Sequence, residues 1–306
     1  MKLLRYFSLL LLASAFAFPV KDVAMVYTFK PGDQYDYASV TKQTVKQSLL
    51  GMGDFTTEVQ SQSAMKFKVT ELTATGAKIE AQYVRLKIAT NSTILNVNMD
   101  SEGPADDTQN KIVKAMMNKP FFFTLTKTGN VEKVEGVNNI FSGLSSLGLD
   151  EVTIAETTKS MEQHINENSL KASLGFVNYP DKKIKPSDTW SNTASVNQSF
   201  ALQVNNVWNF KKLEEGVAYI DGDGTITTPD KDKQMSLPNG MKAKTDLSGR
   251  QAITTKVDAK TGWPTEIKTL SELKGAMTLL AGGILPMDTE VPIEIQSEGN
   301  ITITKK

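Results

Sequence analysis

The sequence predicts a β-dominated α+β fold: one large curved antiparallel sheet, half-barrel-like and built from two related halves, with amphipathic helices packed on one face. Three observations predict it. Apolar and polar residues alternate over most of the chain, which is the period of half-buried strands. Three segments near the middle instead carry apolar residues at helical spacing. A turn of the form Lys-Pro-small-Asp opens a strand at Lys30 and again at Lys185.

The first residues have the pattern of a secretory signal peptide. Lys2 and Arg5 are basic, residues 6–12 are apolar, and a small-x-small motif places the cleavage between Ala17 and Phe18. The alternative is a retained membrane anchor, but a helix needs about 20 apolar residues to span a bilayer. We therefore expect cleavage and export.

The domain organisation follows from this cleavage and from the repeated turn. Residues 1–17 form the signal peptide, and residues 18–306 form a single β-rich domain. Its two related halves cover about 22–177 and 178–306, each of which opens with the same turn.

Composition narrows the functional classes. Removal of Lys2 and Arg5 from a chain with 34 basic and 34 acidic residues leaves a net charge of −2, which argues against a nucleic-acid partner. The chain has no Cys, so neither disulfides nor a lipid anchor through Cys are expected. We expect an exported protein that is periplasmic, associated with the outer membrane, or extracellular. No segment of the mature chain predicts a membrane-spanning helix.

In the first half, strands are predicted where apolar residues recur at every second position. These runs are Tyr35/Tyr37, Met65/Phe67/Val69, Ile79/Ala81/Tyr83, Val84/Leu86/Ile88, Leu95/Val97/Met99 and Phe121/Phe123/Leu125. The phase slips between Tyr83 and Val84, which predicts a β-bulge. Thr75-Gly76 predicts a hairpin turn.

Three amphipathic helices are predicted within the first half. The segments are 105–118, 137–147 and 154–174, and each places its apolar residues along one stripe. Thr153 and Glu156 have the spacing of a capping box in front of the third helix.

In the second half the strand pattern returns. The runs are Phe200/Leu202/Val204, Trp208/Phe210, Val217/Tyr219, Met241/Ala243/Thr245/Leu247, Ile253/Thr255/Val257 and Ile267/Thr269. A Lys-Thr-Gly turn occurs at 127–129 and again at 260–262, in the same order relative to the opening turns. This repetition predicts an internal duplication.

Several motifs together resemble a family of exported bacterial proteins of unknown function. They are Pro180, the run Lys185–Trp190, Asp258 with Thr261–Pro264, and Ile284–Met287. The predicted architecture also resembles, more loosely, the lipoprotein-carrier half-barrels of the Gram-negative envelope. The resemblance implies a cell-envelope protein and transfers no motif residue by residue.

Few residues suggest catalysis or metal binding. His164, the only histidine, lies in a predicted helix, where a solvated residue is expected rather than a general base. Asp221 and Asp223 alternate with Gly as calcium-loop residues do, but Ile226 replaces the glycine required at the sixth position, and Asp-Gly is also a hairpin turn. We expect no cofactor and no metal.

Apolar side chains of the helices and of one sheet face form the candidate ligand-binding lining. They are Met65, Phe67, Met116, Met117, Phe121, Phe123, Phe141, Met161, Trp208 and Phe210. If helices and sheet close completely on each other, these residues are core. If a gap remains, its Met-rich lining would suit an acyl chain.

The leading hypothesis is therefore an exported, non-enzymatic binding protein that holds an apolar or lipid-like ligand between sheet and helices. The alternatives are a structural or protein/glycan-interaction module of the cell envelope, and a carboxylate-based hydrolase that would use Asp221 and Asp223.

Overall fold

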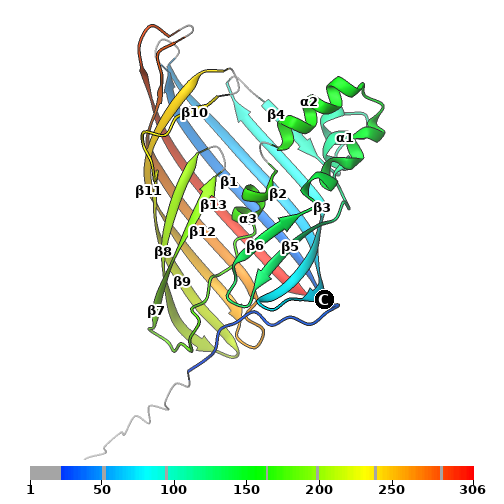
Figure 1. Cartoon of the computed structure of the whole chain (residues 1–306), viewed down its shortest axis with the longest axis vertical. Coiled ribbons are helices and arrows are strands. Elements are labelled where there is room, and N and C mark those ends of the chain that lie inside the picture. Colours follow the sequence, from blue (N-terminus) through cyan, green and yellow to red (C-terminus); the bar gives the residue numbers. More distant parts are fainter. Residues whose placement is uncertain are drawn as a thin grey trace, which may run out of the picture.

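One curved antiparallel sheet dominates the computed structural model, which describes residues 22–49, 53–93, 96–162, 165–197, 200–237, 240–282 and 285–306 (Figure 1). Neighbouring strands follow the order β6-β5-β3-β2-β1-β13-β12-β11-β9-β8-β7, with β4 added to β3 and β10 added to β11. The fold class predicted from the sequence is confirmed.

The first half supplies six strands. They are β1 (Gln34–Leu49), β2 (Gly53–Leu72), β3 (Gly76–Ser92), β4 (Asn96–Asp100), β5 (Phe121–Thr126) and β6 (Val131–Glu135). The second half supplies β7 (Thr189–Asn197), β8 (Ala201–Glu214), β9 (Val217–Thr227), β10 (Met235–Ser236), β11 (Lys242–Asp258), β12 (Pro264–Leu279) and β13 (Thr289–Lys305).

The β-bulge predicted from the change of phase is present in β3. Ala64 of β2 pairs with Arg85, whereas the next residue, Met65, pairs with Tyr83. Val84 is therefore the additional residue, and it restores an inward-facing apolar pattern on both sides of the bulge.

The helices differ from the prediction in their bounds. The structure has α1 (Thr108–Ala115), the 3₁₀ helix η1 (Val137–Leu147), α2 (Glu151–Glu162) and α3 (Glu167–Ser173). The predicted helix 154–174 is thus two helices, because Asn166 takes an extended conformation and caps α3. His164 lies outside the described residues. Among the helices that the structure describes, none has the length and apolar character needed to cross a bilayer.

The predicted capping box at Thr153 and Glu156 is wrong. Asp150 caps α2 instead, since its Oδ1 accepts a hydrogen bond from the backbone N of Thr153 at 2.9 Å. Its ionised carboxylate is a stronger acceptor than the threonine hydroxyl and begins the helix one turn earlier. The capping box of this region is formed by Asn166 and Ser169 at α3.

The two halves repeat their strand order. Strands β1, β2, β3, β5 and β6 occur in the same spatial sequence as β7, β8, β9, β11 and β12, and β13 lies between the two sets. The opening turns also match in conformation, since Gly32 and Ser187 both have positive φ, 91° and 78°. Their backbone N atoms donate to Val69 O and Phe210 O on the adjacent strands, at 2.8 and 2.7 Å.

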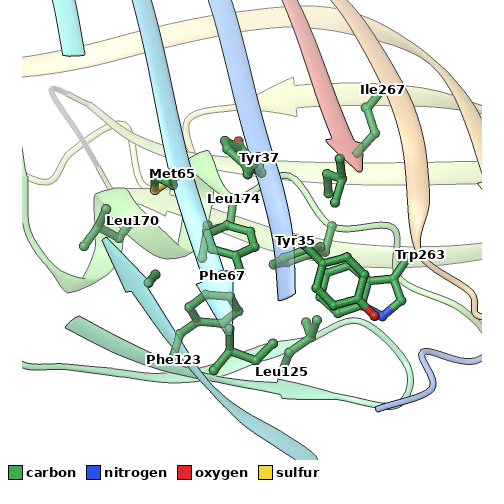
Figure 2. Packing of buried hydrophobic residues seen from close by; sticks show 14 of the residues in the cluster. Tyr35, Tyr37, Met65, Phe67, Phe123, Leu125, Leu170, Leu174, Trp263 and Ile267 are labelled. Atoms are coloured by element: carbon green, nitrogen blue, oxygen red, sulfur yellow. The ribbon is translucent and has the colours of Figure 1, made fainter. Parts of the chain in front are cut away.

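The main core lies inside the curve, at the end where β1 begins. Tyr35 stacks on Trp263 with 4.0 Å between ring centroids, and Phe67 meets Phe123 edge to face at 5.3 Å (Figure 2). The Tyr27 hydroxyl joins the two ends of the first half, because it accepts from Val177 N at 3.1 Å and donates to Val177 O at 3.2 Å.

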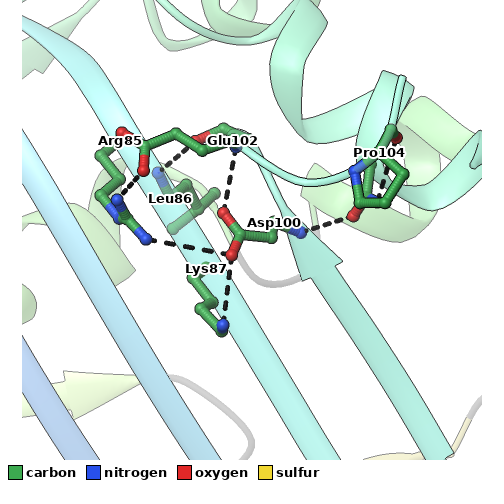
Figure 3. Close-up of polar contacts among 8 residues, drawn as sticks. Arg85, Leu86, Lys87, Asp100, Glu102 and Pro104 are labelled. Carbon is green, nitrogen blue, oxygen red and sulfur yellow. Dashed lines mark hydrogen bonds and ion pairs between the residues drawn. The ribbon is translucent and has the colours of Figure 1, made fainter.

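A polar cluster attaches β4 and α1 to β3 (Figure 3). Asp100 contacts Lys87 at 3.2 Å and also Arg85, which pairs with Glu102. Asn110 of α1 accepts from Asp100 N at 2.8 Å. Such half-exposed ion pairs add little stability, so their main effect is to hold this connection in place.

Candidate functional site

The concave face of the sheet lines a partly open cavity of about 780 Å³. Strands β1, β2, β3, β7, β8, β11, β12 and β13 line it together with α3, residues 129–131, Gly175, Phe176 and Asn178. The volume lies within the roughly 300–1,000 Å³ typical of ligand pockets. Helix α3 packs against both β6 and β7, so it bridges the two ends of the strand order beside this cavity.

Strand register aligns uncharged polar residues across the concave face in one line, here called the polar row. Directly paired neighbours are Asn192 (β7), Asn206 (β8), Gly224 (β9), Gln251 (β11), Ser271 (β12), Ser297 (β13) and Gln43 (β1). Four of them, Asn192, Asn206, Gln251 and Ser297, line the cavity.

Mostly apolar residues flank the polar row on both sides. On one side of the polar row, two residues away from it along each strand, the paired residues are Ala194, Val204, Ile226, Gly249, Leu273, Ile295 and Val45. On the other side of the polar row, again two residues away along each strand, the paired residues are Trp190, Trp208, Gly222, Ile253, Thr269, Gly299 and Thr41. The cavity therefore combines apolar side chains with hydroxyl and amide groups. The polar groups also occur outside the polar row, on β1 and β2 at Ser39, Thr41, Ser61 and Ser63.

Hydrogen bonds hold the amides on the β7 side of the cavity. Trp208 Nε1 donates to Asn192 Oδ1 at 2.6 Å, and Asn192 Nδ2 donates to Asn178 Oδ1 at 3.0 Å. Gln251 Nε2 donates to Asn206 Oδ1 at 2.7 Å. These bonds fix the orientation of buried and half-buried amides that would otherwise be costly to desolvate.

Asp221 and Asp223 form neither a calcium loop nor a hairpin turn, because they lie within β9 with their side chains directed away from the cavity. The alternating glycines face inward for a steric reason. A Cβ at Gly222 would lie 2.9 Å from the Trp208 ring, and one at Gly224 would lie 2.5 Å from the Gln251 side chain. Among the residues that the structure describes, no group of three metal-ligating side chains occurs.

Charge is scarce in the cavity. Within the described lining, Lys171 of α3 is the one charged side chain, and its Nζ lies 2.9 Å from Glu167 Oε1. This hydrogen bond lowers the pKa of Glu167, so its carboxylate is charged at neutral pH. Burial raises the pKa of Tyr83 to about 12, so this lining residue is neutral there.

The structure separates the residues of the predicted lining. Met65 and Trp208 line the cavity. The other eight do not: Phe67, Met116, Phe121, Phe123, Phe141 and Phe210 are buried in the main core, and Met117 and Met161 pack against it half-buried. The helices α1 and η1 contact each other, α1 also contacts β3 and β4, and η1 also contacts β5, so their apolar stripes are used in that packing.

Sequence reasoning missed the polar row. A signal was available, since each member shares the inward parity of apolar neighbours two residues away, as in Val204, Asn206 and Trp208. A polar residue in such a position marks a break in the apolar pattern of that strand face.

Fold and cavity together define a class: a β-rich protein with a curved antiparallel sheet, helices beside it and a pocket in its concave face. The chain belongs to the family of unknown function DUF6263, whose model matches residues 74–264. This match confirms the resemblance to a family of unknown function. No curated protein matches the sequence.

Solved structures with a similar course of the chain include two envelope or lipid-related proteins. One is lipovitellin, in a structure that concerns its lipid–protein interactions; it has 9% identity and a TM-score of 0.48, and the match covers 90% of this chain. The chain spans only 25% of that lipovitellin chain. An outer membrane channel from Pseudomonas putida F1 has 8% identity and a TM-score of 0.27, with 91% and 97% of the two chains covered.

Proposed function

We propose that the protein is an exported, non-enzymatic binding protein that holds an apolar or lipid-like small molecule in the concave cavity. The observation that carries the proposal is the cavity itself, about 780 Å³ in volume and lined by the sheet and α3. The export signal predicted for residues 1–17 supports a role in the cell envelope or outside the cell.

The lining supports an apolar ligand. Met65, Leu86, Ile88, Phe176 and Ile301 contribute apolar surface from two strands of the first half, from β13 and from the segment after α3. Each Å² of apolar surface that a ligand removes from water stabilises the complex by about 25 cal/mol. Met65 can adjust its shape to ligands of different outline.

The cavity should be tested by filling it. Ser297 lies on its wall, and the preceding residue, Gln296, is directed to the opposite face of the same strand and lies outside the lining. Ser297→Trp should abolish the fluorescence increase of the apolar probe N-phenyl-1-naphthylamine, whereas Gln296→Trp should leave it unchanged. Equal binding by both variants, with circular dichroism showing both to be folded, would place the probe elsewhere and refute the proposal.

The natural occupant should be visible in protein purified from its own cell envelope. Native mass spectrometry of the chain 18–306 should show a bound mass that organic extraction removes, and Ser297→Trp should lack it. A wild-type protein that binds neither the probe nor a copurified molecule would contradict a carrier function.

A further inference from the structure

Among the polar side chains of the polar row, Asn206 is buried and the others are half-buried. Asn206 is only 7% exposed and lines the cavity with Gln251. Burying amides costs free energy unless they are hydrogen-bonded, so an amide pair in this position restricts what the cavity can hold. We infer that the ligand is a neutral amphiphile whose uncharged hydroxyl, ester or amide group binds Asn206 and Gln251, an inference that rests on the proposed function.

The amide pair leaves one donor and one acceptor available. The bond from Gln251 Nε2 to Asn206 Oδ1 uses one end of each amide. In the described part of the chain, it is the only hydrogen bond of either side chain. Whichever way the two amides are turned, one NH₂ group and one carbonyl oxygen of the pair remain available to bind a ligand. A hydroxyl group satisfies both, because it donates and accepts.

The surroundings disfavour a charged group at this position. Val204 and Trp208, two residues away on β8, are both largely buried. Lys171, the charged residue of the described lining, is already paired with Glu167 at 2.9 Å. A carboxylate or ammonium group next to Asn206 would lose its hydration without gaining an opposite charge, which costs far more than desolvating a hydroxyl group.

The apolar part of the ligand has space on the other side of the lining. Met65, Leu86 and Phe176 line the cavity from β2, β3 and the segment after α3. A molecule with its polar group at Gln251 can therefore place its chain against apolar side chains of the same cavity.

The test compares three amphiphiles with the same 12-carbon chain, each used below its critical micelle concentration to displace N-phenyl-1-naphthylamine. They are 1-monolauroylglycerol, laurate and dodecyltrimethylammonium. The neutral compound should bind at least about tenfold more tightly than either charged one. Asn206→Leu and Gln251→Met should each reduce this preference to about threefold or less, because a polar partner of the head group is lost.

Asn205→Leu is the matched control, since Asn205 is exposed on the opposite face of β8. It should retain the preference. Equal or tighter binding of a charged compound, or an equal loss in the Asn205 control, would overturn the inference while leaving the cavity proposal intact. Failure of the wild type to bind the probe at all would refute both.

Discussion

Replacing Gly222 by Ala tests the explanation of the alternating Asp-Gly motif. The new Cβ would lie 2.9 Å from Cε3 and Cζ3 of Trp208 and 3.4 Å from Cβ of Ile253. Carbon atoms pack best at about 3.5–4.0 Å, so the indole ring would have to retreat. The ring is 4% exposed and is held by its 2.6 Å hydrogen bond to Asn192, so it has little room to move.

The expected cost follows from these contacts. Overpacking of this kind destabilises by about 1–3 kcal/mol, and weakening the Trp208 hydrogen bond adds about 0.5–1.5 kcal/mol. The loss of chain entropy in the unfolded state offsets about 0.4–1 kcal/mol. We expect a net loss near 2 kcal/mol, which corresponds to a fall in Tm of about 4–8 °C for a domain of this size.

The assay is thermal unfolding followed by circular dichroism, with Asp223→Ala as the control. Asp223 is exposed on the outer face of the same strand, so its replacement should change stability by no more than about 0.5 kcal/mol. Calcium should not raise the Tm of the wild type, as it would if it bound the native state. A Gly222→Ala protein as stable as the wild type, or equal losses in both variants, would refute the reasoning.

Three further predictions concern backbone conformation, buried hydrogen bonds and pH. Ser187→Gly should raise stability by about 0.5–1 kcal/mol in urea unfolding, because φ is 78° at this position; a loss would contradict the strain. Tyr27→Phe should cost about 2 kcal/mol or more of stability, because Val177 N and O lose their hydrogen-bond partner. Tyr35→Phe should be nearly neutral, because the buried Tyr35 hydroxyl has no hydrogen-bond partner within the described structure. Similar losses of stability in the two variants would contradict this explanation. Burial raises the pKa of Tyr83 to about 12, so the stability that its neutral hydroxyl contributes is complete below about pH 10 and is lost as pH rises toward 12. In unfolding titrations, Tyr83→Phe should reduce this alkaline loss of stability by up to about 1.4 kcal/mol per pH unit. An unchanged slope would exclude Tyr83 as a source of the loss.

Much of the architecture follows from local patterns. Strand faces, the bulge at Val84 and the repeated turns at Gly32 and Ser187 could be predicted, because each depends on the residues of one short segment. The division of the predicted helix 154–174 could not, since Asn166 is a polar residue that either a helix surface or a cap can accommodate.

The candidate site was predicted only in outline. Met65 and Trp208 line the cavity, but Phe121 and Phe141, which have the same apolar character, are buried in the core. Hydrophobicity indicates which side chains leave water, whereas the distances between packed elements determine whether a void remains beside them.

The sequence by itself determined the period of the strands and the family to which the chain belongs. The tertiary structure alone decided that Gln43, Asn206 and Ser297 belong to one row, and that this row borders a cavity. The physical reason lies in register. Alternation is a local property of each strand, but the alignment of strands distant in sequence depends on all their pairings together, and a slip of one residue would turn every side chain of a strand to the opposite face.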